Sequence, residues 1–287
     1  MHFAVQPNAV EAEPQVTAPV TEDELPWSLE HIFSENRVKR ALQEFDPSSA
    51  AGPDGIRPIM LQKGWGSIGD AFICIAKASY QLGHTPEIWR NSASIFLPKP
   101  GKDDYNNPKS FRTITLSPVL LKWMERVILW HMEADLKVYN KLSKKQFGFK
   151  RGSSTTAAIH KLVRKLEMAM LNKGMALGTF LDIEGAFDNV SFVSIERALS
   201  KNCKSSSVNR WIMSMIRCRH TKIELQGKEK VISILRGCPQ GGILSPFLWN
   251  LVINDLLEYT RDKIPCDLQG FADDISLVSV VTNPQKP

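Results

Sequence analysis

A chain of 287 residues that is 43% hydrophobic and 23% charged has the composition of an ordinary globular protein, with one large domain or two lobes. Its apolar runs are too short to span a bilayer, and its first residues lack the basic and apolar segments of a secretory signal. Five scattered cysteines without a Cys-x-x-Cys pair argue against a disulfide framework or a zinc site and favour a reducing compartment.

The net charge of +6 is unevenly distributed along the chain. The first 30 residues contain six acidic residues and neither Lys nor Arg, whereas residues 99–151 contain twelve basic residues against five acidic ones. Such a concentration of basic residues suits a polyanion, through phosphate neutralisation and counterion release. A solvated basic face explains the charge equally well.

The N-terminal part of the chain predicts a disordered leader followed by helices. Residues 1–26 contain four prolines and few large apolar residues, which is typical of disorder. Apolar spacing predicts one helix through Val38 and Phe45, and a second at residues 67–82 that ends before Gly83. A turn-rich stretch at residues 48–56 separates the two helices.

Two strand-like runs, residues 93–98 and 110–116, flank a polar loop and predict a hairpin. This hairpin would place Lys99, Lys102 and Arg112 near one another, where they could bind a triphosphate through charge-assisted bonds. A basic surface hairpin is the alternative. A long apolar helix at residues 119–132 follows.

Residues 144–156 form a glycine-containing loop that mixes aromatic and basic side chains, a combination that suits a nucleic-acid backbone. The loop leads into an amphipathic helix through residues 159–170. The candidate nucleic-acid-binding residues are Lys144, Lys145, Lys150 and Arg151.

The second half of the chain contains candidate functional residues at Asp182, which ends an apolar segment, and at Gln240, which lies between glycines. Residues 176–183 predict a buried strand that ends at Asp182, and an acid in this position is frequently catalytic. Two helices and a hairpin turning at residues 226–227 come next. Glycines around Gln240 permit a close approach by another molecule, and Ser245 with Pro246 predicts a helix start.

Two adjacent aspartates, Asp273 and Asp274, lie between two short apolar runs near the end of the chain. Their flanking residues predict a hairpin of buried strands with the acids at its turn. Adjacent carboxylates repel unless a cation neutralises them, and a hard divalent metal is the usual solution. A solvated surface turn is the alternative.

Taken in order, these stretches resemble the reverse transcriptase domain of non-LTR (LINE-type) retrotransposons, most closely those of arthropod elements. The resemblance spans residues 28–281, and each of its motifs is weak alone. The motifs are Ala-Gly-Pro-Asp-Gly-Ile (51–56), Leu-Pro-Lys-Pro-Gly-Lys (97–102), Phe-Arg-Thr-Ile (111–114), Gln-Phe-Gly-Phe (146–149), Phe-Leu-Asp (180–182) with Ala-Phe-Asp (186–188), Gly-Cys-Pro-Gln-Gly-Gly (237–242) and Phe-Ala-Asp-Asp (271–274).

The resemblance implies an α+β right-hand polymerase fold, with fingers from residues 27–172 and a palm from residues 173–287. The sequence ends before the next palm motif, the primer-gripping hairpin and the thumb of the family. It also has no room for an endonuclease or RNase H domain. We therefore expect a fragment of a longer element, without a thumb.

The resemblance also assigns the chemistry. Asp182, Asp273 and Asp274, with the backbone carbonyl of Ile183, would hold two Mg²⁺ ions, for which Mn²⁺ could substitute. These ions would promote in-line attack of a primer 3′-hydroxyl on the α-phosphate of a deoxynucleotide, a chemistry that the aspartates themselves favour. The implied partners are an RNA template, a DNA primer and dNTP, with no membrane. The oligomeric state stays open, and family biology implies nucleus, cytoplasm or both.

Further roles follow residue by residue from the resemblance. Arg112 and Lys99 would hold the triphosphate, Phe187 would pack under the sugar and exclude a 2′-hydroxyl, and Gln240 with Gly241 would line the nucleotide pocket. Core packing is the alternative for Phe187. The chain departs from the family where Thr113 replaces proline and Phe271 replaces tyrosine. Asp188 is expected to cap a helix or to support the metal ligands rather than to bind metal itself, and Glu184 is expected to be ordinary surface.

Two alternative functions remain at this point. One is a nucleic-acid-binding remnant of such an element without catalysis, which keeps the basic segment but does not grip a primer. The other is a palm polymerase of another lineage, such as an intron-encoded or telomerase-like enzyme. The amino-acid residues of the motifs at 146–149 and 238–242 resemble those of the retrotransposon family more than those of that other lineage.

Overall fold

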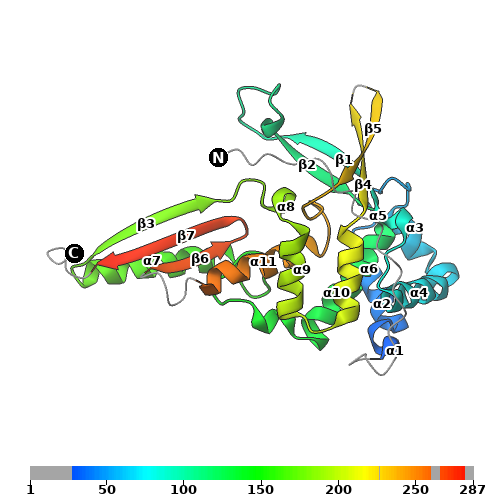
Figure 1. The fold of residues 1–287 in the computed structure, drawn as a ribbon, viewed down its shortest axis with the longest axis horizontal. Helices are drawn as coiled ribbons and strands as arrows, with labels where there is room; N and C mark the ends of the chain where they lie inside the picture. Colours follow the sequence, from blue (N-terminus) through cyan, green and yellow to red (C-terminus); the bar gives the residue numbers. More distant parts are fainter. Residues whose placement is uncertain (1–27, 226, 260–265, 282–287) are drawn as a thin grey trace.

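The computed structural model of the chain describes residues 28–225, 227–259 and 266–281, so the predicted leader at residues 1–26 lies outside the described residues. Within these ranges the fold combines helices with a four-stranded and a three-stranded sheet. Figure 1 shows the three-stranded sheet at the left, the four-stranded sheet at the top, and most helices below and to the right. The expected α+β class is confirmed.

The helices that precede and follow the first hairpin pack as one group (Figure 1). They are α1 (Leu29–Ile32), α2 (Glu35–Gln43), α3 (Pro58–Lys63), α4 (Trp65–Leu82), α5 (Glu87–Arg90) and α6 (Val119–Trp130), which continues as a π-helical turn at His131–Asp135 and a 3₁₀ turn at Val138–Lys141. The Phe72 ring stacks on Trp123 with centroids 3.6 Å apart, and the Trp123 indole donates to the Val38 carbonyl at 2.7 Å. Gly83 ends α4 with a left-handed φ of 60°, as predicted.

The four-stranded sheet joins two hairpins that are distant in sequence. Its strands are β1 (Asn91–Pro98), β2 (Phe111–Leu116), β4 (Arg219–Leu225) and β5 (Lys228–Ile234), in the order β2-β1-β4-β5. β1 and β4 are parallel, and the other neighbours are antiparallel. The loop between β1 and β2 contains a 3₁₀ turn at Pro108–Ser110. This sheet combines residues from both sides of the predicted boundary between residues 172 and 173.

The three-stranded sheet is antiparallel and carries the aspartates. Its strands are β3 (Met175–Asp182), β6 (Asp267–Phe271) and β7 (Asp274–Val281), in the order β3-β7-β6. Helix α7 (Thr155–Leu171) runs along it, and the Gln269 side chain of β6 donates to the Ala158 carbonyl of α7 at 3.1 Å. The predicted pairing of the aspartate hairpin with the strand of Asp182 is therefore present.

The prediction that the strand ending at Asp182 is buried is wrong. All eight residues of β3 are exposed, including Leu177 at 70% and Phe180 at 69%. The strand lies at one edge of its sheet, whereas β6 at the other edge contacts both α7 and helix α11 (Ser245–Tyr259) and is mostly buried. An apolar run indicates a strand reliably, but it does not tell a buried strand from an exposed edge.

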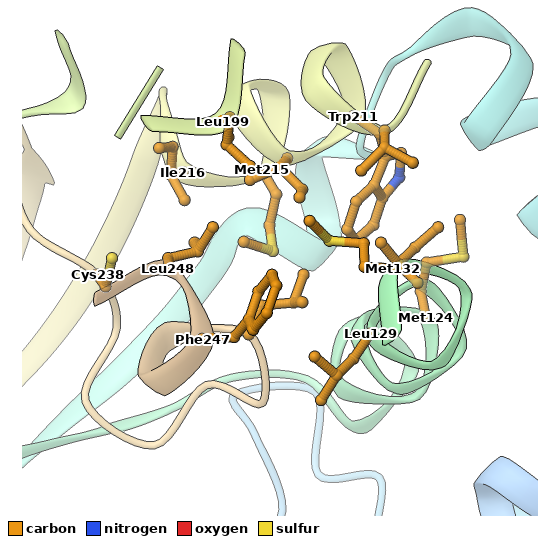
Figure 2. Packing of buried hydrophobic residues seen from close by; sticks show 14 of the residues in the cluster. Met124, Leu129, Met132, Leu199, Trp211, Met215, Ile216, Cys238, Phe247 and Leu248 are labelled. Carbon is orange, nitrogen blue, oxygen red and sulfur yellow. The ribbon is translucent and has the colours of Figure 1, made fainter. Parts of the chain in front are cut away.

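The remaining helices form the core beside the aspartate sheet. They are α8 (Ala186–Asn189), α9 (Phe192–Asn202), α10 (Ser206–Ile216) and α11 (Ser245–Tyr259). Figure 2 shows Met215 of α10 and Phe247 of α11 meeting Leu129 of α6 and Met132 of the turn that continues it, and each of these side chains is at most 9% exposed. The predicted helix start at Ser245 is confirmed. No helix in the described ranges is both long and apolar enough to cross a bilayer.

Candidate active site

The candidate active site lies where β3 and the β6-β7 hairpin end together. Asp182 is paired in register with Asp274, so the two side chains project from the same face of neighbouring strands, with Cα atoms about 4.5–5.5 Å apart. The Ile183 amide donates to the Asp273 carbonyl at 3.3 Å, which brings the third acid to the same end of the sheet. Asp182 and Asp274 are exposed, and Asp273 is half-buried.

The hairpin turn that carries Asp273 has two residues. Phe271 pairs with Asp274, which leaves Ala272 and Asp273 as the loop. Ala272 has a φ of 57°, in the left-handed region that favours glycine, and tight two-residue turns require such a value at this position. The Trp249 indole N–H donates to the Ala272 carbonyl at 2.9 Å. Neighbouring residues therefore hold the turn in a conformation that alanine alone would not favour.

The carboxylate oxygens at this end of the sheet are ligands that suit a hard divalent cation, although the three aspartates are not clustered around one point. Carboxylates directly opposite each other on two strands repel, and a cation between them removes that repulsion. Asp182 and Asp274 also line a cavity of about 350 Å³ between the sheet and α7. In the part of the chain that the structure describes, no group of three or more His, Cys, Asp or Glu side chains could hold a metal.

The segment that contains Gln240 is bound between α8 and β2. The Cys238 amide donates to the Phe187 carbonyl at 2.7 Å, and the Gln240 carbonyl accepts from the Thr115 amide at 2.8 Å. At Gly241, where φ is 113°, a Cβ would lie 3.0 Å from the Thr115 carbonyl oxygen. The structure therefore places the segment of Gln240 and Gly241 between Phe187 and the strand that carries Arg112.

Glu125 fixes the continuation of this segment into α11. Its carboxylate is 1% exposed and accepts the Ile243 and Leu244 amides at 3.3 and 3.4 Å, at the start of the helix. Burial raises the pKa of Glu125 to about 6, because desolvation outweighs these two hydrogen bonds and the nearby charges of Lys122 and Arg219. No sequence motif pointed to this residue, which lies inside an apolar helix.

The loop between β1 and β2 reaches the end of β3. The Lys109 ammonium lies 2.8 Å from the Glu184 carboxylate, and this contact lowers the pKa of Glu184. Lys99 lies close enough to contribute to the same effect, although its ammonium donates to the Lys109 carbonyl at 2.9 Å. Arg112 is exposed and paired in register with Leu97. Glu184 is thus exposed, as expected of ordinary surface, but it also contacts the loop.

The four basic residues of the loop at 144–151 have different surroundings. The ammonium groups of Lys145 and Lys150 donate to main-chain carbonyls, at 3.5 Å to Leu257 and 3.0 Å to Ser143. Burial lowers the pKa of Lys150, with a further contribution from Lys144. Arg151 lies 3.7 Å from Glu133, and Lys144 is exposed. Lys145 and Lys150 therefore hold the loop in place, through carbonyls of α11 and of the residue just before the loop.

Sequence reasoning missed several residues that hold the site. Gln146 was noted only as part of a motif, and Asn250 and Trp249 were not singled out. A polar Asn between Trp249 and Leu251 in an otherwise apolar helix is a signal that could have identified one of them, because such a group needs a partner when it is buried.

The mixed helix-and-sheet fold, with its paired aspartate strands and bound glycine-rich segment, is the right-hand fold of the reverse transcriptase class. Residues 97–284 match the family described as reverse transcriptase (RNA-dependent DNA polymerase), and the chain belongs to this family.

The relatives of the chain come from insect retrotransposons of the non-LTR type. The chain is 28% identical to a putative 115 kDa protein in the R1DM element of Drosophila melanogaster over 89% of its length. It is 30% identical to the Pol polyprotein of element R1 from Bradysia coprophila, over 81%, and to the RNA-directed DNA polymerase of the mobile element jockey from Drosophila melanogaster, over 69%. The chain spans about a quarter of the length of these relatives, namely 24%, 22% and 22%.

Among solved structures, the chain is similar to an apo telomerase from Candida tropicalis truncated from the C-terminal domain. The TM-score is 0.49 at 13% identity, over 70% of this chain and 45% of the telomerase chain.

Proposed function

We propose that the chain is the RNA-directed DNA polymerase domain of a non-LTR retrotransposon, which joins deoxynucleotides to a primer 3′-hydroxyl on an RNA template. The single observation that carries this proposal is the register of Asp182 with Asp274, next to a turn that presents Asp273, in a chain of the reverse transcriptase family. Jockey, a relative, is named as an RNA-directed DNA polymerase.

Two Mg²⁺ ions, or Mn²⁺ in their place, would be held by the three aspartates and the Ile183 carbonyl. When bound, the ions supply the activation of the 3′-hydroxyl and the stabilisation of the leaving pyrophosphate. Carboxylates suit this role because Mg²⁺ is bound through a few protein oxygens together with substrate phosphates. The alignment of Asp182 and Asp274 on neighbouring strands supports this assignment.

The remaining residues would bind and orient the nucleotide. The Arg112 guanidinium on β2 offers a bidentate contact to the triphosphate, and Lys99 lies in the loop that precedes this strand. Phe187 would pack under the sugar, where its ring excludes a 2′-hydroxyl and so selects deoxynucleotides. Gln240 and Gly241 would line the pocket, and the Gln240 hydrogen bond to β2 and the close approach of Gly241 to that strand support this placement.

The template and primer would bind across the two halves that we assign as fingers (27–172) and palm (173–287). Lys144 and Arg151 are the better candidates for phosphate contacts, because Lys145 and Lys150 already donate to carbonyls of the protein. Such contacts would make binding strongly dependent on salt concentration.

The proposal is tested by incubating the chain with a DNA primer annealed to an RNA template, the four dNTPs and Mg²⁺. We expect primer extension that requires the metal and is abolished by Asp273→Asn. Asp70→Asn, at an exposed position on α4, is the matched control and should extend the primer normally. If neither this chain nor a version continued through the next segment of the element extends the primer, the polymerase proposal is wrong.

A second candidate function is a nucleic-acid-binding remnant without catalysis. The observation that favours it is the basic loop before α7, in which the side chains of Lys144 and Arg151 are exposed. Salt-sensitive RNA binding by the chain, with no extension and no difference between wild type and Asp273→Asn, would select this function over the first.

A further inference from the structure

Gln146 and Asn250 form a buried amide pair behind the turn that carries Asp273. The Gln146 Nε2 donates to the Asn250 Oδ1 at 2.9 Å, and the two residues are 2% and 0% exposed. They are 104 positions apart, so the pair joins the loop before α7 to helix α11. Removal of either partner would leave the other amide unsatisfied in the interior, which costs about 1–3 kcal/mol.

The remaining polar atoms of the pair bind the backbone of residues 147–149. The Gln146 Oε1 accepts the Phe147 and Gly148 amides at 3.0 and 3.3 Å. The Asn250 Nδ2 donates to the Gly148 and Phe149 carbonyls at 3.1 and 3.0 Å. The position of this three-residue segment is therefore set by two side chains.

One side of the segment contacts the turn that carries Asp273. A Cβ on Gly148 would lie 2.1 Å from the Ala272 amide nitrogen, so only glycine permits this approach. The Phe147 amide also donates to the Gly270 carbonyl at 2.9 Å. Trp249, next to Asn250, binds the Ala272 carbonyl, so the turn is held from α11 as well.

The other side of the segment contacts Phe187. The Phe149 ring meets the Phe187 ring edge-on, with centroids 5.8 Å apart. Phe187 in turn lies 6.1 Å from the Trp249 ring. The Phe187 ring, which we assign to sugar selection, is thus flanked by Phe149 and Trp249. Asn250 donates to the Phe149 carbonyl and follows Trp249 in the chain.

We propose that Gln146 and Asn250 are positioning residues, which set the separation between the Asp273 turn and the Phe187 ring through residues 147–149. The proposal rests on the polymerase function above. It follows that loss of the amide pair changes both the rate of nucleotide addition and the selection of deoxynucleotides, although neither side chain touches substrate. A displacement of about 1 Å at a reacting group can lower a rate roughly 100-fold.

The first test is Gly148→Ala, which forces the segment and the turn apart. The matched control is Gly66→Ala in α4, where a Cβ meets no atom within 4 Å. We expect Gly148→Ala to lower kcat for dNTP addition about 100-fold, with KM for dNTP changed much less. Gly66→Ala should leave both unchanged. Equal activity of the two variants would overturn the proposal.

The second test removes the amides with Gln146→Ala, Asn250→Ala and the double variant. Asn202→Ala is the control for loss of a buried amide, because Asn202 is 4% exposed and bonds within α9. We expect the ratio of dNTP to rNTP incorporation to fall about tenfold or more in the three test variants, with the double variant no worse than either single one. Asn202→Ala should lower Tm without changing that ratio. An unchanged ratio in Asn250→Ala would overturn the proposal.

A third measurement separates this proposal from the polymerase function itself. Free Mn²⁺ is measured by electron paramagnetic resonance as each variant is titrated with the metal alone. Weaker Mn²⁺ binding by about tenfold or more in Gly148→Ala and Asn250→Ala, and not in the controls, supports positioning of the aspartates. Should neither the wild-type chain nor its continued version extend a primer, the polymerase proposal fails and this titration still decides the role of the amide pair; equal Mn²⁺ affinity in all variants would then refute it.

Discussion

The Lys109 ammonium lies 2.8 Å from the Glu184 carboxylate, two residues beyond Asp182, and so joins the β1-β2 loop to the end of the aspartate sheet. Both side chains are more than three-quarters exposed, so the pair is open to solvent and is screened by salt. A triphosphate is a stronger partner for an ammonium than one carboxylate. If the chain binds dNTP as proposed, Glu184 would therefore compete with the triphosphate for Lys109.

Glu184→Gln should lower KM for dNTP, because it frees Lys109 for the triphosphate, whereas Lys109→Met should raise it. Steady-state KM at low and at high salt is the measurement, and both effects should shrink at high salt. Glu196→Gln, which removes an ion pair with Arg217 elsewhere, should leave KM unchanged. A KM that moves in neither variant would rule out competition for Lys109.

Arg112→Ala should raise KM for dNTP more than Lys99→Ala. The Arg112 side chain is exposed on β2 and can bind a phosphate through two parallel bonds, whereas the Lys99 ammonium is already bonded to the Lys109 carbonyl. Arg112→Lys should recover only part of the loss, since an ammonium cannot make the bidentate contact. The same steady-state assay checks the order, and a larger effect of Lys99→Ala would contradict it.

The stability of the chain should depend on pH through Glu125, whose pKa is raised from 4.5 to about 6 by burial. Because the folded chain binds this proton more tightly than the unfolded chain, the contribution is fully present below pH 4.5. It is lost as pH rises through 6, by about 2 kcal/mol in the free energy of unfolding.

Urea unfolding of wild type and Glu125→Gln across this pH range measures the effect. The difference between the two proteins should change by this amount between pH 4.5 and pH 7. For Glu167→Gln, at an exposed position on α7, the free energy of unfolding should follow the same pH dependence as that of wild type. Parallel curves for Glu125→Gln as well would show that the carboxyl titrates normally in the folded chain.

Periodic and turn-forming residues were sufficient to predict most of the elements. The apolar spacing in α9 and the αL glycine that ends α4 are local signals, and each has one structural solution. The pairing of the Asp182 strand with the aspartate hairpin was also expected, but only because a family resemblance placed two distant strands side by side. Strand pairing across more than ninety residues has no local signal.

Neither the exposure of β3 nor the polar contacts in the interior could be predicted from neighbouring residues in the sequence. Leu177 and Phe180 look like core residues in sequence, yet they are exposed on β3 while β6, at the other edge of the same sheet, is mostly buried. Gln146 and Asn250 look like any polar residues until the fold buries them against each other. The chemistry-bearing aspartates were recognisable from sequence, whereas the groups that hold them in place were not.

The opposition of Asp182 and Asp274 should make the metal-free chain less stable than its neutralised variants. Like charges directly opposite on antiparallel strands are destabilising, so Asp182→Asn and Asp274→Asn should each raise Tm in buffer containing a chelator. Added Mn²⁺ should raise the Tm of wild type, because a ligand that binds only the folded chain stabilises it, and should raise that of the variants less. Differential scanning fluorimetry with and without the metal measures both effects, with Asp70→Asn behaving as wild type. If Asn at either position leaves Tm and its response to Mn²⁺ unchanged, then the two carboxylates neither repel each other nor share a cation, and the site assigned to them is wrong.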